Sequence, residues 1–162
     1  MKKQNILFVC TGNTCRSIMA QAIFLKLKEE LFPDLSLEPD SAGIAVSDNL
    51  APSREAIFCL AKRGIDITTY QPKMVTDQII QNSSLVLAMT NQQMDYLKEH
   101  FLWAREKIYL FRLFCQQKNY MKDEEIEDPY GRGIFFYEDI CKILTEDLKK
   151  LIYYFRKEGK NE

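Results

Sequence analysis

The chain contains 162 residues, of which 46% are hydrophobic and 28% charged, and this length and balance indicate one globular domain with a sizeable core. Its 22 basic and 23 acidic residues give a net charge of −1, which excludes a general nucleic-acid-binding protein on electrostatic grounds. No apolar run approaches the ~20 residues that a membrane span needs, so no membrane partner is expected.

Short apolar segments alternate with helical patterns along the chain. In chain order, the patterns predict a strand at 6–9, a helix from 17 to the stop at 33, a strand ending near 41–43, a helix over 53–62, a strand at 85–89, a helix over 91–100, a strand at 107–111 and a long terminal helix over 136–155. This alternation is typical of an α/β fold with a parallel sheet and helices on both faces. Because ligands bind beyond the carboxyl ends of such strands, and the first strand ends at Cys10, we expect the functional site there. One domain is expected over residues 1–158, with a frayed tail at 159–162.

The cysteines bear on the compartment and on metal binding. They are Cys10, Cys15, Cys59, Cys115 and Cys141. Their number is odd, and no pair of the last three has metal-ligand spacing, so reduced thiols, no metal and a cytoplasmic protein are expected. The first residues are not expected to be a secretion signal, because the apolar run before Cys10 is shorter than the ~7–15 residues of a signal's hydrophobic region.

Residues 10–17, with the sequence CTGNTCRS, lie between the first predicted strand and the first predicted helix. A loop that wraps at a helix N-terminus points several backbone N–H groups into one hollow, which suits a tetrahedral oxyanion. Gly12 and Asn13 are the residues best able to adopt the positive φ angles that this wrapping requires. The same positive field favours the thiolate form of Cys10, so the segment is predicted to be a phosphate-binding loop with a nucleophile.

Further side chains would complete a site for phosphoryl transfer. The planar guanidinium of Arg16 can bind two phosphoryl oxygens. Ser17 is the predicted N-cap of the first helix, and its hydroxyl could also donate to the Cys10 thiolate. A cysteine phosphatase needs a proton donor, for which Asp128 is the candidate, in the only Asp-Pro pair of the chain. Pro129 stiffens that loop, and the glutamates just before it would favour the protonated carboxyl.

Three motifs together resemble the low-molecular-weight protein tyrosine phosphatases: residues 9–17, Ser41-Ala42-Gly43 and Asp128-Pro129-Tyr130. The resemblance covers essentially the whole chain and implies a flavodoxin-like three-layer fold with a central four-stranded parallel sheet. It also implies a two-step mechanism without a metal or other cofactor. Cys10 would attack phosphorus and form a cysteinyl-phosphate while Asp128 protonates the leaving group. Water activated by Asp128 would then release phosphate.

The resemblance also implies supporting roles. Asn13 and Ser41 would hold the loop through hydrogen bonds, and Cys15 would form a reversible disulfide with Cys10 under oxidation. The aromatic side chain of Tyr130 is expected to be a wall of the pocket. The residues expected to bind substrate or phosphate are Thr11, Gly12, Asn13, Thr14, Cys15, Ser17 and Tyr130.

Position 14 bears on the substrate. Tyrosine-specific members usually carry a bulky aliphatic residue there, whereas the bacterial members that resemble protein arginine phosphatases carry threonine, in the string CTGNTCRS found here. The strings LVLAMT at 85–90 and DPYG at 128–131 agree with that branch. The resemblance therefore favours phosphoarginine on proteins, with a phosphotyrosine-specific enzyme as the alternative. We expect a monomer that acts on phosphorylated proteins and binds inorganic phosphate or other oxyanions in the loop.

Two other classes of protein compete with a phosphatase. Arsenate reductases coupled to thioredoxin share this fold and nearly this loop, but they need a further mobile cysteine pair, and residues 88–98 contain no cysteine. A non-catalytic phosphate-binding module is disfavoured because Cys10, Arg16 and Asp128 are all present. Two positions depart from the family pattern: Ile18 stands where proline is usual, and Tyr70 where many members have a histidine that supports the loop.

Overall fold

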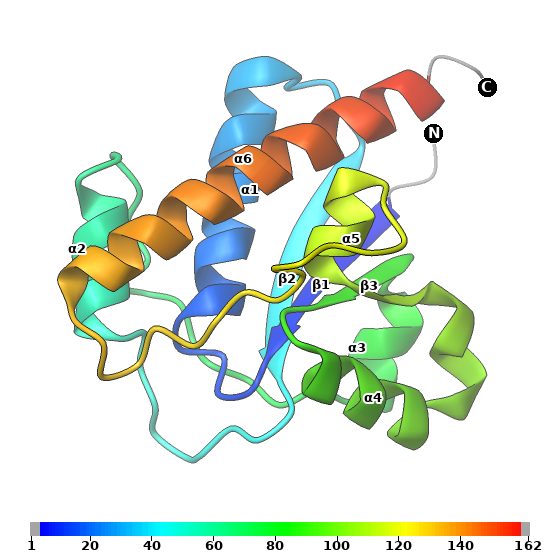
Figure 1. Ribbon diagram of the computed structural model, residues 1–162, viewed down its shortest axis with the longest axis horizontal. Helices are drawn as coiled ribbons and strands as arrows, with labels where there is room; N and C mark the ends of the chain where they lie inside the picture. Colours follow the sequence, from blue (N-terminus) through cyan, green and yellow to red (C-terminus); the bar gives the residue numbers. More distant parts are fainter. Residues whose placement is uncertain (1–3, 160–162) are drawn as a thin grey trace.

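The structure, a computed structural model, describes residues 4–159 and contains a parallel sheet with the strand order β2-β1-β3-β4 (Figure 1). The strands are β1 (Gln4–Cys10), β2 (Leu37–Gly43), β3 (Leu85–Ala88) and β4 (Ile108–Leu110). The predicted flavodoxin-like α/β fold is therefore confirmed. Alternate residues of β1 face opposite layers, so both faces of the strand are covered by apolar side chains.

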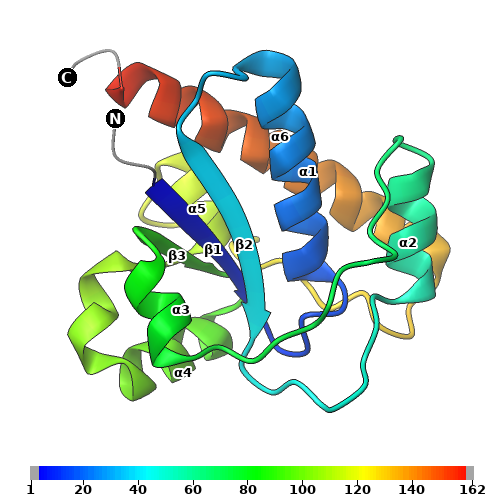
Figure 2. The same ribbon diagram turned by 180° about the vertical axis from the view of Figure 1, so that it is seen from behind.

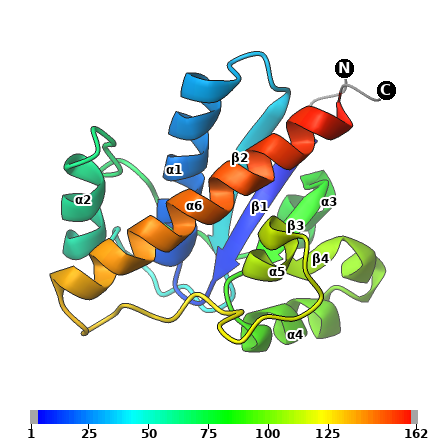
Figure 3. The same ribbon diagram turned by 45° about the horizontal axis from the view of Figure 1, so that its top comes forward.

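Helices cover both faces of the sheet. One face packs against α1 (Arg16–Leu31), α2 (Arg54–Ala61), α5 (Phe111–Gln116) and α6 (Ile134–Glu158). The other face, which Figure 2 shows from behind, packs against α3 (Asp77–Asn82), α4 (Asn91–His100) and the 3-10 helix η1 (Leu102–Lys107). The long helix α6 runs across α1 (Figure 3). Within residues 4–159, no helix is both long enough and apolar enough to cross a membrane.

Every predicted strand and helix is found, with shifted ends, but three short helices were not predicted: α3, η1 and α5. Each of these helices has six residues, which is two turns or fewer, and leaves little periodicity to detect. The predicted strand at 107–111 ends at Leu110, and Phe111 already begins α5, because a short apolar run is compatible with either structure. Of the predicted tail, only Gly159 lies within the described residues.

Two basic residues directly after α2, Lys62 and Arg63, form ion pairs with one carboxylate of α6. Glu138 Oε2 accepts from Arg63 Nη2 at 2.8 Å, and Glu138 Oε1 lies 3.2 Å from Lys62 Nζ. The hydrogen bond from Arg63 lowers the pKa of Glu138 to about 2. Nearby, burial raises the pKa of the Cys59 thiol to about 12. This junction matters for the site because α2 and α6 both contribute side chains that contact the loop after β1.

Replacing Glu138 by glutamine is expected to lower the free energy of unfolding at pH 7 by about 1–2 kcal/mol. The folded-state pKa of Glu138 lies below its ordinary value of 4.5, so the stabilisation is present above that pH and is lost as the pH falls toward about 2. Urea unfolding between pH 7 and pH ~2.5 should show the two proteins converging. Glu146→Gln, at an exposed position of the same helix, should match the wild type throughout. Equal stability of Glu138→Gln and wild type at pH 7 would contradict the assignment.

Candidate active site

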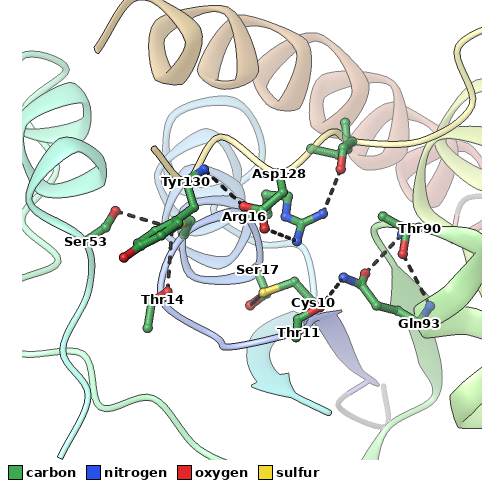
Figure 4. Close-up of polar contacts among 12 residues, drawn as sticks. Cys10, Thr11, Thr14, Arg16, Ser17, Ser53, Thr90, Gln93, Asp128 and Tyr130 are labelled. Atoms are coloured by element: carbon green, nitrogen blue, oxygen red, sulfur yellow. Dashed lines mark hydrogen bonds and ion pairs between the residues drawn. The ribbon is translucent and has the colours of Figure 1, made fainter. Parts of the chain in front are cut away.

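The loop between β1 and α1 lies at the topological switch point of the sheet, because the chain passes from β1 to β2 on one side and later returns to β3 on the other. Crevices at such points are where open α/β sheets bind ligands. Cys10 is the last residue of β1 and is 2% exposed. Figure 4 shows the side chains of this loop together with those that reach it from distant parts of the chain.

Ser17 contacts the sulfur of Cys10, and Asn13 in turn contacts Ser17. Cys10 Sγ lies 2.9 Å from Ser17 Oγ, and Asn13 Nδ2 donates to the same Oγ at 2.8 Å. Because the serine oxygen accepts from Asn13, its own proton is available to the sulfur. The prediction that Ser17 caps α1 is wrong: the helix begins at Arg16, and the cap position is Cys15. No side chain of the described residues hydrogen-bonds to that helix end, so its first N–H groups are available to an anion.

The sharp turn of the loop depends on Asn13 and Gly43. Asn13 has the predicted positive φ, at 54°, and its Oδ1 accepts from Lys73 N at 3.0 Å. Gly12 does not have a positive φ, so that prediction is wrong: a single left-handed residue is enough to turn the loop. Gly43 allows the close approach of β2, because a Cβ there would lie 2.5 Å from the Thr11 carbonyl oxygen. The Ser41 hydroxyl donates to Gln21 Oε1 at 2.6 Å, so its predicted hydrogen bond to the loop is not formed.

Arg16 lies almost fully buried beneath the segment that carries Asp128. Its Nη1 donates to the carbonyl oxygen of Ile126 at 2.9 Å, and its Nη2 lies 3.6 Å from Asp128 Oδ2. Its Nε is buried, and no atom of the described residues accepts a hydrogen bond from it. Burying a cation with an N–H group that has no acceptor is energetically costly. A phosphoryl oxygen bound beside Arg16 would supply that acceptor and a compensating negative charge. The N–H of Ile126 in turn donates to the carbonyl oxygen of Met89, which directly follows β3. This hydrogen bond holds the segment that carries Asp128 against the end of the sheet.

Asp128 lies at the open side of the site. Its side chain is 60% exposed, and its Oδ1 accepts from Tyr130 N at 3.1 Å. The ring of Tyr130, expected to be a pocket wall, is on the same segment and largely exposed. The glutamates that precede Asp128 have other partners, because Glu124 and Glu125 accept from Asn91 and Glu127 pairs with Arg132. The hydrogen bonds and ion pairs of these glutamates are therefore made with Asn91 and Arg132, and none is made with Asp128.

Two side chains that the sequence analysis did not single out hold the other side of the loop. Cys15 Sγ lies 3.4 Å from Ser53 Oγ and 3.3 Å from the Tyr137 hydroxyl, and Ser53 N donates to the carbonyl oxygen of Thr14 at 2.9 Å. Burial raises the pKa of Tyr137 above its ordinary value. Thr14 therefore has a backbone fixed from the start of α2, while its partly exposed side chain remains at the rim.

Ile18, Cys59, Cys115 and Cys141 belong to the larger core cluster, and Tyr70 packs against it. Ile18, in place of the usual proline, is buried in the first turn of α1 and continues the helix. Tyr70 packs against the larger core cluster, and burial raises its pKa. Cys59, Cys115 and Cys141 are buried, and burial raises the pKa of each thiol. Within residues 4–159, no group of three or more His, Cys, Asp or Glu side chains is placed to hold a metal ion.

A thiol, an arginine and a carboxylate gathered at the start of α1 provide the groups that phosphoryl transfer through cysteine requires. Together with the flavodoxin-like sheet, this arrangement defines the class of cysteine-dependent phosphatases. Within that class, the chain belongs to the low molecular weight phosphotyrosine protein phosphatase family, whose model matches residues 5–161.

The relatives of this chain are named as phosphatases of two different substrates. It is 30% identical to a protein-arginine-phosphatase from Bacillus subtilis over 154 residues, covering 95% of this chain and 98% of that one. It is also 30% identical to the low molecular weight protein-tyrosine-phosphatase Ptp of Acinetobacter johnsonii, covering 89% and 92%. Among solved structures, it resembles a YwlE arginine phosphatase mutant with a phosphorylated active-site serine in place of cysteine, with a TM-score of 0.89 at 29% identity, covering 98% and 100%. Overall identity therefore does not distinguish the two substrates.

Proposed function

We propose that this protein removes phosphate from phosphorylated arginine side chains of proteins, with Cys10, Arg16 and Asp128 carrying out the reaction. The observation that carries the arginine assignment is Thr14 at the rim of the loop. Its short, polar side chain leaves room for a flat guanidinium that a longer aliphatic side chain would obstruct.

In the first step, Cys10 Sγ attacks phosphorus and the P–N bond breaks, while the carboxylic acid of Asp128 gives its proton to the departing guanidino nitrogen. The phosphoryl oxygens are bound by the N–H groups at the start of α1 and by the guanidinium of Arg16, whose Nε lacks a protein partner. A dianionic phosphoryl group would also replace Asp128 as the neighbour of Arg16. The hydroxyl of Ser17 stabilises the sulfur whenever it carries a negative charge.

In the second step, a water molecule attacks the cysteinyl-phosphate and Asp128 takes its proton. The S–P bond breaks, which releases inorganic phosphate and restores the thiolate of Cys10. The YwlE structure with a phosphorylated serine at the nucleophile position supports this route, because it shows a relative with phosphorus bonded to that side chain.

Replacing Thr14 by isoleucine tests the arginine assignment. We expect kcat/KM for a phosphoarginine protein to fall by about 10- to 100-fold, because the longer side chain occupies the space of the guanidinium. The value for a phosphotyrosine peptide should change by less than about threefold, and hydrolysis of para-nitrophenyl phosphate serves as the control for an intact loop. An equal change on both phosphorylated side chains would count against Thr14 as the cause of the preference.

A phosphotyrosine-specific enzyme is the second candidate. The exposed ring of Tyr130 favours it, because an aromatic side chain can stack on a phenyl ring as well as on a guanidinium. We further propose a monomer in a reducing compartment such as the cytoplasm. The five cysteines support the compartment, since all are buried and none forms a disulfide.

A further inference from the structure

Gln93 is a buried polar residue that reaches the loop from a distant part of the chain. It is 2% exposed, although it lies in the first turn of α4. Its Oε1 accepts from Thr90 N at 3.0 Å, and its backbone N donates to Thr90 Oγ1 at 3.3 Å, which forms a capping box. Its Nε2 donates to Thr11 Oγ1 at 3.0 Å, across 82 positions of sequence. The side-chain amide thus uses one end for its own helix and the other for the residue after Cys10.

The capping box fixes which way the amide faces. Turning the amide over would place its NH2 group against the N–H of Thr90, so the donor end must face Thr11. The oxygen of Thr11 therefore accepts a hydrogen bond, and the proton of its hydroxyl is left to donate elsewhere. Thr11 is exposed, and within residues 4–159 its hydroxyl has no other hydrogen-bond partner.

The two threonines of the loop are held from opposite sides. Figure 4 shows Thr14 on the side of Ser53 and Thr11 on the side of Gln93, with Cys10 between them. The same turn of α4 also contacts the segment that carries Asp128, because Asn91 donates to Glu124 and Glu125 at 2.8 and 2.7 Å. The start of α4 therefore fixes the distance between the loop and that segment.

We propose that Gln93 is a positioning residue that makes the Thr11 hydroxyl a hydrogen-bond donor to a phosphoryl oxygen of the bound substrate. This role rests on the proposed phosphatase function but is independent of whether the substrate is phosphoarginine or phosphotyrosine. Gln93 itself touches neither the substrate nor the reacting atoms. Its contribution passes through Thr11, so removing either partner should have the same consequence.

A double-mutant cycle between Gln93→Met and Thr11→Val tests this coupling. Methionine keeps the length of the side chain and removes both polar ends. The readouts are the inhibition constant of inorganic phosphate and kcat/KM for para-nitrophenyl phosphate. Each single variant should raise the inhibition constant of phosphate and lower kcat/KM by about five- to tenfold each. The double variant should match Thr11→Val in both quantities within about twofold. Gln92→Met, at the exposed neighbouring position, should match the wild type.

Wild-type values for Gln93→Met would overturn the proposal, as would a double variant whose loss equals the product of the two single losses. The second result would mean that Gln93 acts only by stabilising α4. If Gln93→Met does not fold, Thr11→Ser and Thr11→Val decide instead. Serine should keep the wild-type values and valine lose about five- to tenfold, whereas wild-type values for valine would overturn the role of the hydroxyl. A wild-type protein that neither binds phosphate nor hydrolyses the aryl ester would refute the proposed function itself.

Discussion

Replacing Cys10 by serine is expected to lower kcat by about 10⁴-fold or more, while the affinity for inorganic phosphate stays within about threefold of the wild type. A serine hydroxyl is a far weaker nucleophile than a thiolate, so the cysteinyl-phosphate route is lost. Phosphate binding persists because the N–H groups at the start of α1 and the guanidinium of Arg16 are unchanged. Steady-state kinetics and calorimetric titration with phosphate provide the two measurements.

A buried cysteine provides the matched control for that experiment. Cys59 lies in the core with a pKa raised to about 12 by burial, so its thiol is not a nucleophile at neutral pH. Cys59→Ala should therefore keep the wild-type kcat. Turnover retained by Cys10→Ser, or lost equally in Cys59→Ala, would contradict the assignment of Cys10.

Replacing Asp128 by asparagine is expected to lower kcat/KM for a phosphoarginine protein by about 10³-fold, but by less than about tenfold for para-nitrophenyl phosphate. The guanidine must be protonated as it departs, whereas para-nitrophenolate leaves readily without a proton. Asparagine keeps the shape of the side chain and an oxygen that can accept from Tyr130 N, so the loop is preserved. The ratio of the two losses therefore reports on proton donation alone.

Glu127→Gln controls for a change of charge in the same segment. Glu127 is exposed and pairs with Arg132, not with the site, so its replacement should leave both substrates within about twofold of the wild type. Equal losses on the two substrates in Asp128→Asn would show that Asp128 is needed for binding or folding and not as the proton donor.

The sequence was sufficient for the fold and for the groups closest to Cys10. Parallel strands that alternate with helices have few possible arrangements, and the chemistry of phosphoryl transfer made Arg16 and Asp128 candidates for the site, where the structure places Arg16 Nη2 3.6 Å from Asp128 Oδ2. The first and last residues of the helices and strands could not be predicted as accurately. Ser17 is of a residue type common at the N-cap, but its hydroxyl contacts Cys10 and Asn13 instead. Which of these contacts the hydroxyl makes depends on the three-dimensional path of the whole loop, which the local sequence does not indicate.

The residues that the sequence did not reveal are those that act through tertiary contacts. Gln93 looks like an ordinary polar residue of an amphipathic helix, and Gln92 beside it is one, since only the packing of α4 on the sheet buries the former. Ser53 and Tyr137 fit a helix cap and a helix core, and nothing local indicates that both meet Cys15. The role of Gly43 was equally hidden, because it depends on how closely β2 approaches Thr11.

The most direct test of the proposed function is a comparison of kcat/KM for the wild-type protein on one carrier protein phosphorylated either on arginine or on tyrosine, with Cys10→Ser as the blank. We predict that phosphate is released from phosphoarginine at least about tenfold more efficiently, and that the blank turns over either substrate at least about 10⁴-fold more slowly than the wild type. Equal efficiency on the two, or a preference for phosphotyrosine, would contradict the arginine assignment.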